Sequence, residues 1–181
     1  KSDWRCRFVV STKSRSTRVR APTPARAIVS AVAEPSAPQP TTRMRERRIS
    51  HVSATEMAAV AAASALACAG LAPGDLDLII YGGVSNDELC PNSSSGVQIM
   101  LGAPRAAAID LNTACTSFCY GLATATAMIK TGVVRNAVVI GTELISRYID
   151  WSNRNVAVLF GDGSAAVVLQ ATDRDEGVLG S

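Results

Sequence analysis

The chain has 181 residues, of which 48% are hydrophobic and 18% are charged, the balance of an ordinary soluble globular domain. Its net charge of +3 hides two opposite parts, because residues 1–45 hold ten Lys and Arg against two acids, whereas residues 46–181 hold eight against thirteen. The basic part has no aromatic residue after Phe8 and the remainder is acidic, which excludes a basic nucleic-acid-binding face. No apolar run approaches the roughly 20 residues that a membrane helix needs, so we expect no membrane partner.

The cysteine pattern excludes two further classes of protein. The chain has five cysteines, an odd number without a Cys-x-x-Cys pair, and its single histidine, His51, is distant from the pair that is closest in sequence. This pattern is neither a disulfide framework nor a zinc site, so we expect no metal. Reduced thiols indicate a cytoplasmic protein. The cysteines are Cys6, Cys68, Cys90, Cys115 and Cys119.

Residues 1–42 are rich in Arg, Ser, Thr and Pro and have no sustained period of 2 or 3.6 residues. This composition predicts a disordered or extended segment without a first strand, followed by a folded domain over 43–181. Three explanations of the segment stay open: a plastid transit peptide, since it is Arg- and Ser-rich and poor in acids, a divergent extension, or a stretch that is not native. The first would make the protein plastidic instead of cytoplasmic.

From Ser53 onward the chain alternates between helical and strand patterns. Ser53 and Glu56 form a capping box before an Ala-rich helix, which Gly70 ends. The alternation predicts an α/β layered fold, and Gly161 to Gly163 are read as the turn of an antiparallel hairpin between the last two strands. The predicted helices are 53–70, 93–101 and 116–131, and the predicted strands are 76–81, 107–111, 137–141, 154–160 and 165–170.

Cys115 lies between an apolar strand and a helix of small residues. A thiol at a helix N-terminus faces unpaired backbone N–H groups and the positive end of the helix dipole, which favour the nucleophilic thiolate. The helix that follows is apolar or small on nearly every face, which predicts that it is buried all round. The sequence therefore predicts a nucleophile at Cys115, with a buried structural cysteine as the alternative.

The stretch from Gly161 to Ala166 also fits the dinucleotide fingerprint G-x-G-x-x-A. That fingerprint requires a helix immediately afterwards, because the helix N-terminus binds the pyrophosphate. The residues that follow have a strand pattern instead. We therefore expect no dinucleotide site here.

Five blocks, taken in order, resemble the thiolase-fold condensing enzymes, and most closely the beta-ketoacyl-acyl-carrier-protein synthase III group. They lie at 71–83, 90–102, 107–130, 137–144 and 154–166, within a similarity that runs from about residue 43 to residue 181. The resemblance implies an α/β/α thiolase-like fold, with this chain as the N-terminal half of a duplicated αβαβα arrangement.

The resemblance also implies a reaction. In it, Cys115 takes an acyl group from acyl-CoA for decarboxylative condensation with malonyl-acyl carrier protein in fatty acid or polyketide biosynthesis, with no further cofactor. The implied partners are acyl-CoA, the acyl carrier protein and a second copy of the chain in a homodimer. The family's catalytic His and Asn belong to the second half, beyond Ser181, and His51 matches neither, so we expect this chain alone to be an incomplete enzyme.

Four further residues match family positions. Arg154 and Arg43 correspond to contacts with coenzyme A, Phe160 to a wall of the acyl channel, and Cys90 to a residue that reaches the partner's acyl pocket. Their alternatives are solvated arginines, core packing and a loop cysteine.

Thr116 and Ser117 depart from the small residue and glycine that usually follow the family's cysteine. This departure keeps two other functions open: transfer of the acyl group to an acceptor other than malonyl-carrier protein, and a non-catalytic half-protein that binds a synthase partner.

Overall fold

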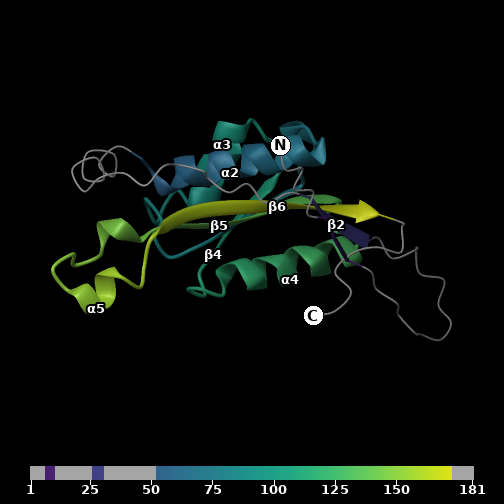
Figure 1. Cartoon of the computed structure of the whole chain (residues 1–181). Coiled ribbons are helices and arrows are strands. Elements are labelled where there is room, and N and C mark those ends of the chain that lie inside the picture. Colours follow the sequence, from purple (N-terminus) through teal and green to yellow (C-terminus); the bar gives the residue numbers. More distant parts are fainter. Residues whose placement is uncertain (1–6, 11–25, 31–51, 173–181) are drawn as a thin grey trace, which may run out of the picture.

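The computed structural model describes residues 7–10, 26–30 and 52–172. Its centre is a six-stranded sheet in the order β1-β2-β6-β5-β3-β4 (Figure 1). Strands β4, β3 and β5 run parallel to one another, whereas β6 is antiparallel to both of its neighbours, β5 and β2. The strands are β1 (Arg7–Val10), β2 (Arg26–Ser30), β3 (Leu78–Gly82), β4 (Ala107–Leu111), β5 (Asn136–Leu144) and β6 (Asp162–Thr172).

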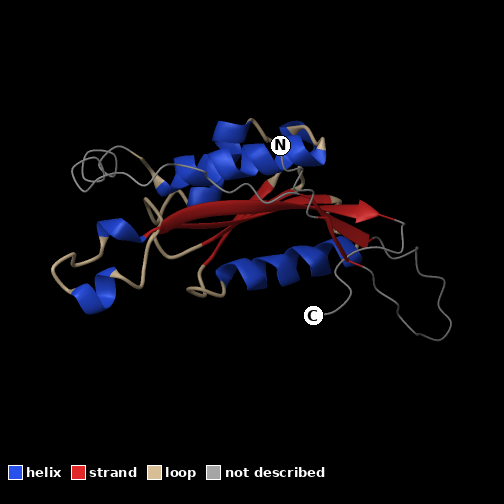
Figure 2. Cartoon of the chain, in the orientation of Figure 1, coloured by secondary structure: helices blue, strands red, loops and turns tan. Residues whose placement is uncertain are grey.

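Helices cover both faces of this sheet, α2 (Ala54–Ala69) and α3 (Ser93–Leu101) on one and α4 (Ser117–Lys130) on the other (Figure 2). The central strand β3 is buried along its whole length. Its side chains alternate between two cores, with Ile79 and Tyr81 in the cluster under α2 and α3, and Leu78 and Ile80 in the cluster under α4. The predicted α/β layering therefore follows from a strand that is apolar on both faces.

Several predicted elements are confirmed. Helix α3 and strand β4 have the predicted bounds. Helix α2 begins with the predicted capping box of Ser53 and Glu56 and ends at Gly70, which adopts a left-handed conformation with φ of 67°. Strand β5 continues three residues past its predicted end at Gly141, because β6 pairs with it as far as Leu144.

The predicted hairpin at Gly161 is wrong. Residues Arg154–Ala157 form a single helical turn, α5, and β6 pairs with β5 instead, from Asn136 opposite Gln170 to Leu144 opposite Asp162. The segment between β5 and β6 therefore leaves the sheet, and it carries the short 3-10 helix η2 (Ile145–Arg147) before α5. Residues 154–160 have a strand-like pattern in the sequence, but their large apolar side chains, Val156, Val158, Leu159 and Phe160, are exposed.

Two strands lie within the segment in which the sequence predicts none. Strand β2 extends the sheet at β6, and β1 pairs with β2. No periodic pattern marks these strands, because each is only four or five residues long. The remainder of residues 1–42 lies outside the described residues, so the domain boundary at residue 43 stays a prediction.

Helix α4 is buried along one stripe only, so the prediction that it is buried all round is wrong. Tyr120 on its opposite face is 57% exposed. On the buried stripe, a Cβ atom at Gly121 would lie 2.9 Å from Cγ1 of Val139, so glycine lets this helix approach the sheet closely. The buried residues of α4 are Ser117, Gly121, Ala125, Thr126 and Ile129.

Candidate active site

A pocket of about 320 Å³ lies at the carboxyl ends of β3 and β5, beside the first turn of α4. This is the edge at which open α/β sheets bind ligands. Cys115, the residue that the sequence predicts as a nucleophile, is among the residues that line it. The lining residues are Gly82, Ala114, Cys115, Ser117, Phe118, Gly141, Thr142, Glu143, Gly161, Asp162 and Gly163.

Strand β4 leads into a tight turn that carries Cys115, and α4 begins two residues later, at Ser117. Ala114 has a φ of 53°, the left-handed region that a residue with a Cβ rarely occupies. The N–H of Ser117 donates to the carbonyl oxygen of Ala114 at 3.0 Å, and the N–H of Thr116 donates to that of Thr113 at 3.3 Å. The turn leaves Cys115 exposed.

Two glycines bring β3 against its neighbours at this edge. A Cβ atom on Gly82 would lie 3.0 Å from Cβ of Ser117, and one on Gly83 would lie 2.2 Å from the carbonyl oxygen of Thr142. Neither position has room for a side chain. The glycine pair therefore lets the end of β3 contact both the first turn of α4 and the end of β5.

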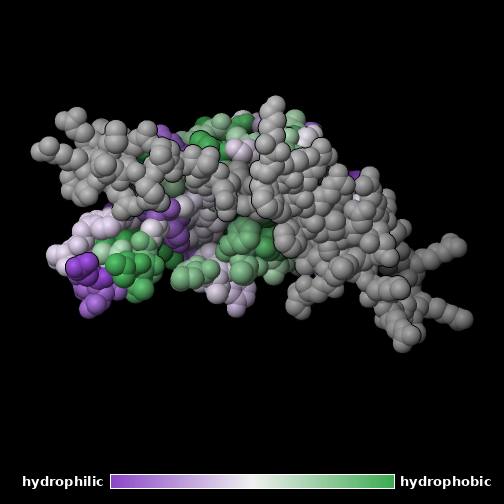
Figure 3. All heavy atoms as spheres, viewed as in Figure 1, coloured by the Kyte–Doolittle hydropathy of each residue, from purple (hydrophilic) through white to green (hydrophobic). Residues whose placement is uncertain are grey.

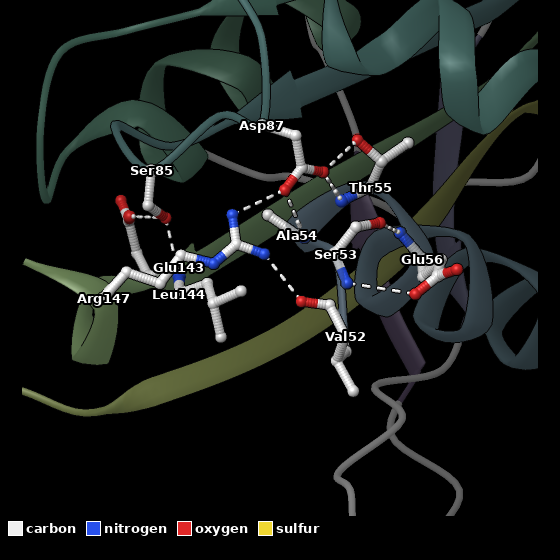
Figure 4. A network of polar contacts seen from close by, with 10 residues as sticks. All are labelled: Val52, Ser53, Ala54, Thr55, Glu56, Ser85, Asp87, Glu143, Leu144 and Arg147. Atoms are coloured by element: carbon white, nitrogen blue, oxygen red, sulfur yellow. Dashed lines mark hydrogen bonds and ion pairs between the residues drawn. The ribbon is translucent and has the colours of Figure 1, made fainter. Parts of the chain in front are cut away.

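Glu143 holds the loop that follows these glycines. Its Oε1 accepts a hydrogen bond from the N–H of Val84 at 3.0 Å, and its Oε2 accepts one from the hydroxyl of Ser85 at 2.6 Å. The same hydroxyl oxygen accepts a hydrogen bond from the N–H of Leu144 at 2.6 Å (Figure 4). The sequence analysis missed Glu143, although an acid directly after the apolar run of β5 is the signal that finds it.

Asp162 also lines the pocket, and its carboxylate binds a residue of the segment between β5 and β6. It accepts hydrogen bonds from the N–H of Ser146 at 2.8 Å and from its hydroxyl at 2.5 Å. The acid between Gly161 and Gly163 therefore anchors η2 to the start of β6. The prediction that a strand follows this motif is confirmed by β6, so it offers no helix N-terminus for a pyrophosphate.

Asp87 joins the loop after β3 to the start of α2 (Figure 4). It accepts hydrogen bonds from the N–H groups of Ala54 and Thr55, at 3.0 and 2.8 Å, and from the Thr55 hydroxyl at 2.7 Å. Arg147 donates to it at 2.8 Å and also to the carbonyl oxygen of Val52. Burial opposes ionisation of this carboxyl, but the hydrogen bonds from Thr55, Ala54 and Arg147 outweigh it and lower the pKa of Asp87 to about 2.

Asp110, on β4, does for α3 what Asp87 does for α2. Its carboxylate accepts hydrogen bonds from the N–H groups of Ser93 and Ser94, at 2.9 and 2.8 Å. The side chain of Asn86 donates to it at 2.6 Å. Asp87 thus ties the loop between β3 and α3 to the start of α2, and Asp110 ties the start of α3 to β4.

The remaining predicted site residues do not line the pocket. Cys90 is exposed in the loop before α3, ahead of a cis peptide bond to Pro91. Arg154 is exposed at the start of α5, and Phe160 is 50% exposed next to the pocket residue Gly161. Arg43 lies outside the described residues. The substrate contacts of all four stay predictions.

Large apolar side chains gather on the surface of the segment between β5 and β6, around α5 (Figure 3). Their exposure ranges from 37% at Val156 to 75% at Val158. The exposed apolar residues of this segment are Tyr148, Trp151, Val156, Val158, Leu159 and Phe160.

Among the residues that the structure describes, no helix is long and apolar enough to cross a membrane, and no three His, Cys, Asp or Glu side chains are grouped to hold a metal ion.

Comparisons with known proteins agree with the resemblance. The family model of 3-oxoacyl-[acyl-carrier-protein] synthase III matches residues 109–181. Beta-ketoacyl-[acyl-carrier-protein] synthase III 2 of Vibrio cholerae is 51% identical over 140 residues, which are 77% of this chain and 39% of that protein. The synthase III of Microcystis aeruginosa is 47% identical over 129 residues, 71% of this chain and 38% of that protein. The chain thus spans about two fifths of the length of these curated relatives.

Solved structures extend the similarity to the fold. The synthase III of Aquifex aeolicus superposes with a TM-score of 0.67 and 40% identity, over 68% of this chain and 40% of that one. The enzyme of Pseudomonas aeruginosa superposes with a TM-score of 0.69 and 30% identity, over 83% of this chain and 53% of that one. These matches confirm the predicted thiolase-like α/β fold.

Proposed function

We propose that this chain, which belongs to the beta-ketoacyl-[acyl-carrier-protein] synthase III family over the residues that it shares with these relatives, supplies the acyl-accepting nucleophile of such an acyltransferase. The observation that carries the proposal is the position of Cys115. Cys115 is exposed and lines the pocket. It follows Ala114, which has a left-handed conformation, two residues before α4 begins. Such a placement suits a thiolate that must meet a substrate.

The step that we assign to this chain is the transfer of an acyl group. The sulfur of Cys115 attacks the carbonyl carbon of an acyl-CoA thioester, a new C–S bond forms, and coenzyme A leaves as its thiolate. The product is an acyl-enzyme thioester. As negative charge develops on the carbonyl oxygen, we assign the backbone N–H of Cys115 as one hydrogen-bond donor to it, a role that the resemblance to the family implies.

The second step is condensation of the acyl group with malonyl-acyl carrier protein, which would make a carrier protein the partner of this chain. The family also implies a homodimer, in which a second copy of the chain is the other partner. For this step we rely on the family alone. The His and Asn that it calls for have no counterpart at the matched positions of residues 43–181. Arg154 and Arg43 are our candidates for coenzyme A contacts, and Phe160 and Cys90 for contacts with the acyl chain.

Glu143 lines the pocket, but we do not assign it the role of base. Both of its carboxylate oxygens already accept hydrogen bonds from residues 84 and 85. Ser117 likewise offers no reason for a different acyl acceptor, because its hydroxyl is engaged within the turn. The engaged hydroxyl of Ser117 therefore does not support a different acyl acceptor, and the acetylation experiment below tests the alternative of a non-catalytic half-protein.

The proposal is tested by incubating the chain with acetyl-CoA and locating the added acetyl group by peptide mass spectrometry. We expect one hydroxylamine-labile acetyl group on Cys115, which Cys119→Ala retains and Cys115→Ala loses. The matched variant at Cys119 controls for the neighbouring thiol, which is also exposed. Acetylation of another cysteine in preference to Cys115 would reject the nucleophile, and no acetylation at all would favour a non-catalytic half-protein.

A further inference from the structure

The turn before α4 contains a residue in an unfavourable conformation. Ala114 has a φ of 53°. This region is unfavourable for a residue other than glycine, which stays there only when its surroundings hold it. Because Ala114 immediately precedes Cys115, whatever holds Ala114 also determines where the thiol lies.

One side chain bridges the two residues before Cys115. The hydroxyl oxygen of Ser117 accepts a hydrogen bond from the N–H of Thr113 at 2.9 Å and donates one to the carbonyl oxygen of Ala114 at 2.7 Å. Ser117 is only 2% exposed, so water competes little for these bonds. The hydroxyl of Ser117 therefore connects the start of α4 to Thr113 and Ala114, the two residues that precede Cys115.

The environment of Ser117 keeps its hydroxyl in this position. Cβ of Ser117 lies 3.0 Å from the place that a Cβ on Gly82 would take, and its backbone carbon lies 3.1 Å from that place. The end of β3 thus packs directly against the first residue of α4. The hydroxyl of the same residue, Ser117, forms the hydrogen bonds within the turn.

We infer that Ser117 is a positioning residue for Cys115: its hydroxyl locks Ala114 in the left-handed conformation and so fixes the thiol at the start of α4. The inference rests on the proposed function, in which Cys115 accepts the acyl group. It also explains the serine that departs from the family's usual glycine at this position. A glycine would offer no side chain to bridge the turn.

The first test compares two hydroxyl deletions in the same turn. Ser117→Ala removes both bridging hydrogen bonds, whereas Thr116→Ala removes an exposed hydroxyl that donates only to the carbonyl oxygen of Thr113, at 2.7 Å. We expect the backbone amides of residues 116 and 117 to exchange hydrogen about fivefold faster in Ser117→Ala. Thr116→Ala should change them less than twofold.

The second readout is the alkylation of Cys115 by iodoacetamide, resolved by peptide mass spectrometry and divided by that of Cys68. Cys68 is exposed on α2, far from the turn in sequence, so its alkylation rate corrects for differences in reagent and pH between samples. Ser117→Ala should lower the alkylation rate of Cys115 by about two- to fivefold. This factor corresponds to the interaction energy between a negative charge and the N-terminus of a helix. The ratio should not move in Thr116→Ala.

A double substitution separates positioning from simple loss of packing. Glycine occupies the left-handed region at little cost, so Ala114→Gly should make the bridge less necessary. We expect Ser117→Ala to have less than half of its effect on amide exchange and on alkylation in the Ala114→Gly background. Additive effects of the two substitutions would overturn the inference, as would wild-type exchange and alkylation in Ser117→Ala.

The same samples, exposed to acetyl-CoA, distinguish this inference from the proposed function. If Cys115 is never acetylated but the exchange and alkylation patterns hold, the proposed function fails and the positioning of the thiol stands. If Cys115 is acetylated equally in the wild type and in Ser117→Ala, with unchanged exchange, the proposed function stands and the positioning role is rejected.

Discussion

The two ends of the parallel strands use carboxylates in the same way but with different results. At the amino end, Asp77 accepts hydrogen bonds from the N–H groups of Arg135 and Asn136, at 2.9 and 3.0 Å, and so fixes the start of β5. At the carboxyl end, Asp87 holds the start of α2, and Glu143, which lines the pocket, holds the loop after β3. A carboxylate that accepts backbone N–H groups is a general structural device. Only beside a close-packed pair of glycines and a thiol does it shape a site.

Replacing a glycine by alanine should lower the free energy of unfolding far more at the carboxyl end of the strands than near the amino end, and this is the largest difference that we expect between the two ends. A methyl group at Gly83 would lie 2.2 Å from the carbonyl oxygen of Thr142, whereas one at Gly74, near the amino end, would meet nothing within 4 Å. We expect Gly83→Ala to lower the free energy of unfolding by about 3 kcal/mol, as overpacking against a backbone does. Urea unfolding of the two variants measures this. A Gly74→Ala variant that loses as much stability would remove the contrast.

Asp87 should have the next largest effect, and it should depend on pH. The pKa of Asp87 is about 2 in the folded chain, below its ordinary value of 3.8. Its contribution is therefore complete above pH 3.8 and is lost as the pH falls through 2, and it amounts to about 2 kcal/mol. Asp87→Asn should lose that stability at neutral pH and show a flatter dependence below pH 4. An unchanged acid limb in Asp87→Asn would contradict the assignment.

Glu143 and Asp77 should separate stability from reactivity. Replacement by alanine removes two hydrogen bonds at Glu143 and three at Asp77, one of them the 3.5 Å contact with the exposed Arg105, at about 1 kcal/mol or less per bond. Both variants should therefore melt at lower temperature. Only Glu143→Ala should also change the alkylation rate of Cys115, because Glu143 lines the pocket and Asp77 lies outside it. Equal alkylation rates in both would show that the loop at residues 84 and 85 does not influence the thiol.

Two ion pairs among the described residues, Arg147 with Asp87 and Arg105 with Asp77, should give the smallest effects, and these effects should also be unequal. The pair of Arg147 and Asp87 is 2.8 Å long with side chains 28% and 21% exposed, whereas that of Arg105 and Asp77 is 3.5 Å long and the arginine is 69% exposed. Arg147 also binds a backbone carbonyl oxygen. We expect Arg147→Ala to cost about 1 kcal/mol and Arg105→Ala about 0.3 kcal/mol or less. Thermal unfolding at low and high salt measures both.

The sequence predicts the part of the fold whose signals are local. The capping box at Ser53 and the apolar run from Ala107 to Leu111 indicate the right elements, because a capping box and a short apolar run are each visible within a few residues. The hairpin at Gly161 failed, because residues 154–160 have a strand-like pattern and the true partner of β6 lies earlier in the chain. Pairing over such distances is a property of the whole sheet.

The site was predictable to the same extent. Cys115 could be found because a strand, a cysteine and a helix follow one another in the sequence. The apolar run of β5 points to the acid Glu143, but the hydrogen-bond partners of Glu143 and Asp162, at residues 84, 85 and 146, are distant in sequence and are known only from the fold. The bonds of Ser117 lie within its own turn, but they depend on the left-handed conformation of Ala114, which the sequence does not mark. The glycine pair at residues 82 and 83 gave no sign of the two surfaces that press on it.

The most direct test of the account is a competition among the exposed thiols of the folded chain. Limiting iodoacetamide is added, and the modified peptides are quantified for Cys68, Cys90, Cys115 and Cys119, which are all exposed. The account predicts that Cys115 is modified first and that urea, which unfolds the chain, abolishes its advantage. If Cys119 or Cys68 reacts as fast as Cys115 in the folded chain, the fold does not select Cys115 and the central claim is wrong.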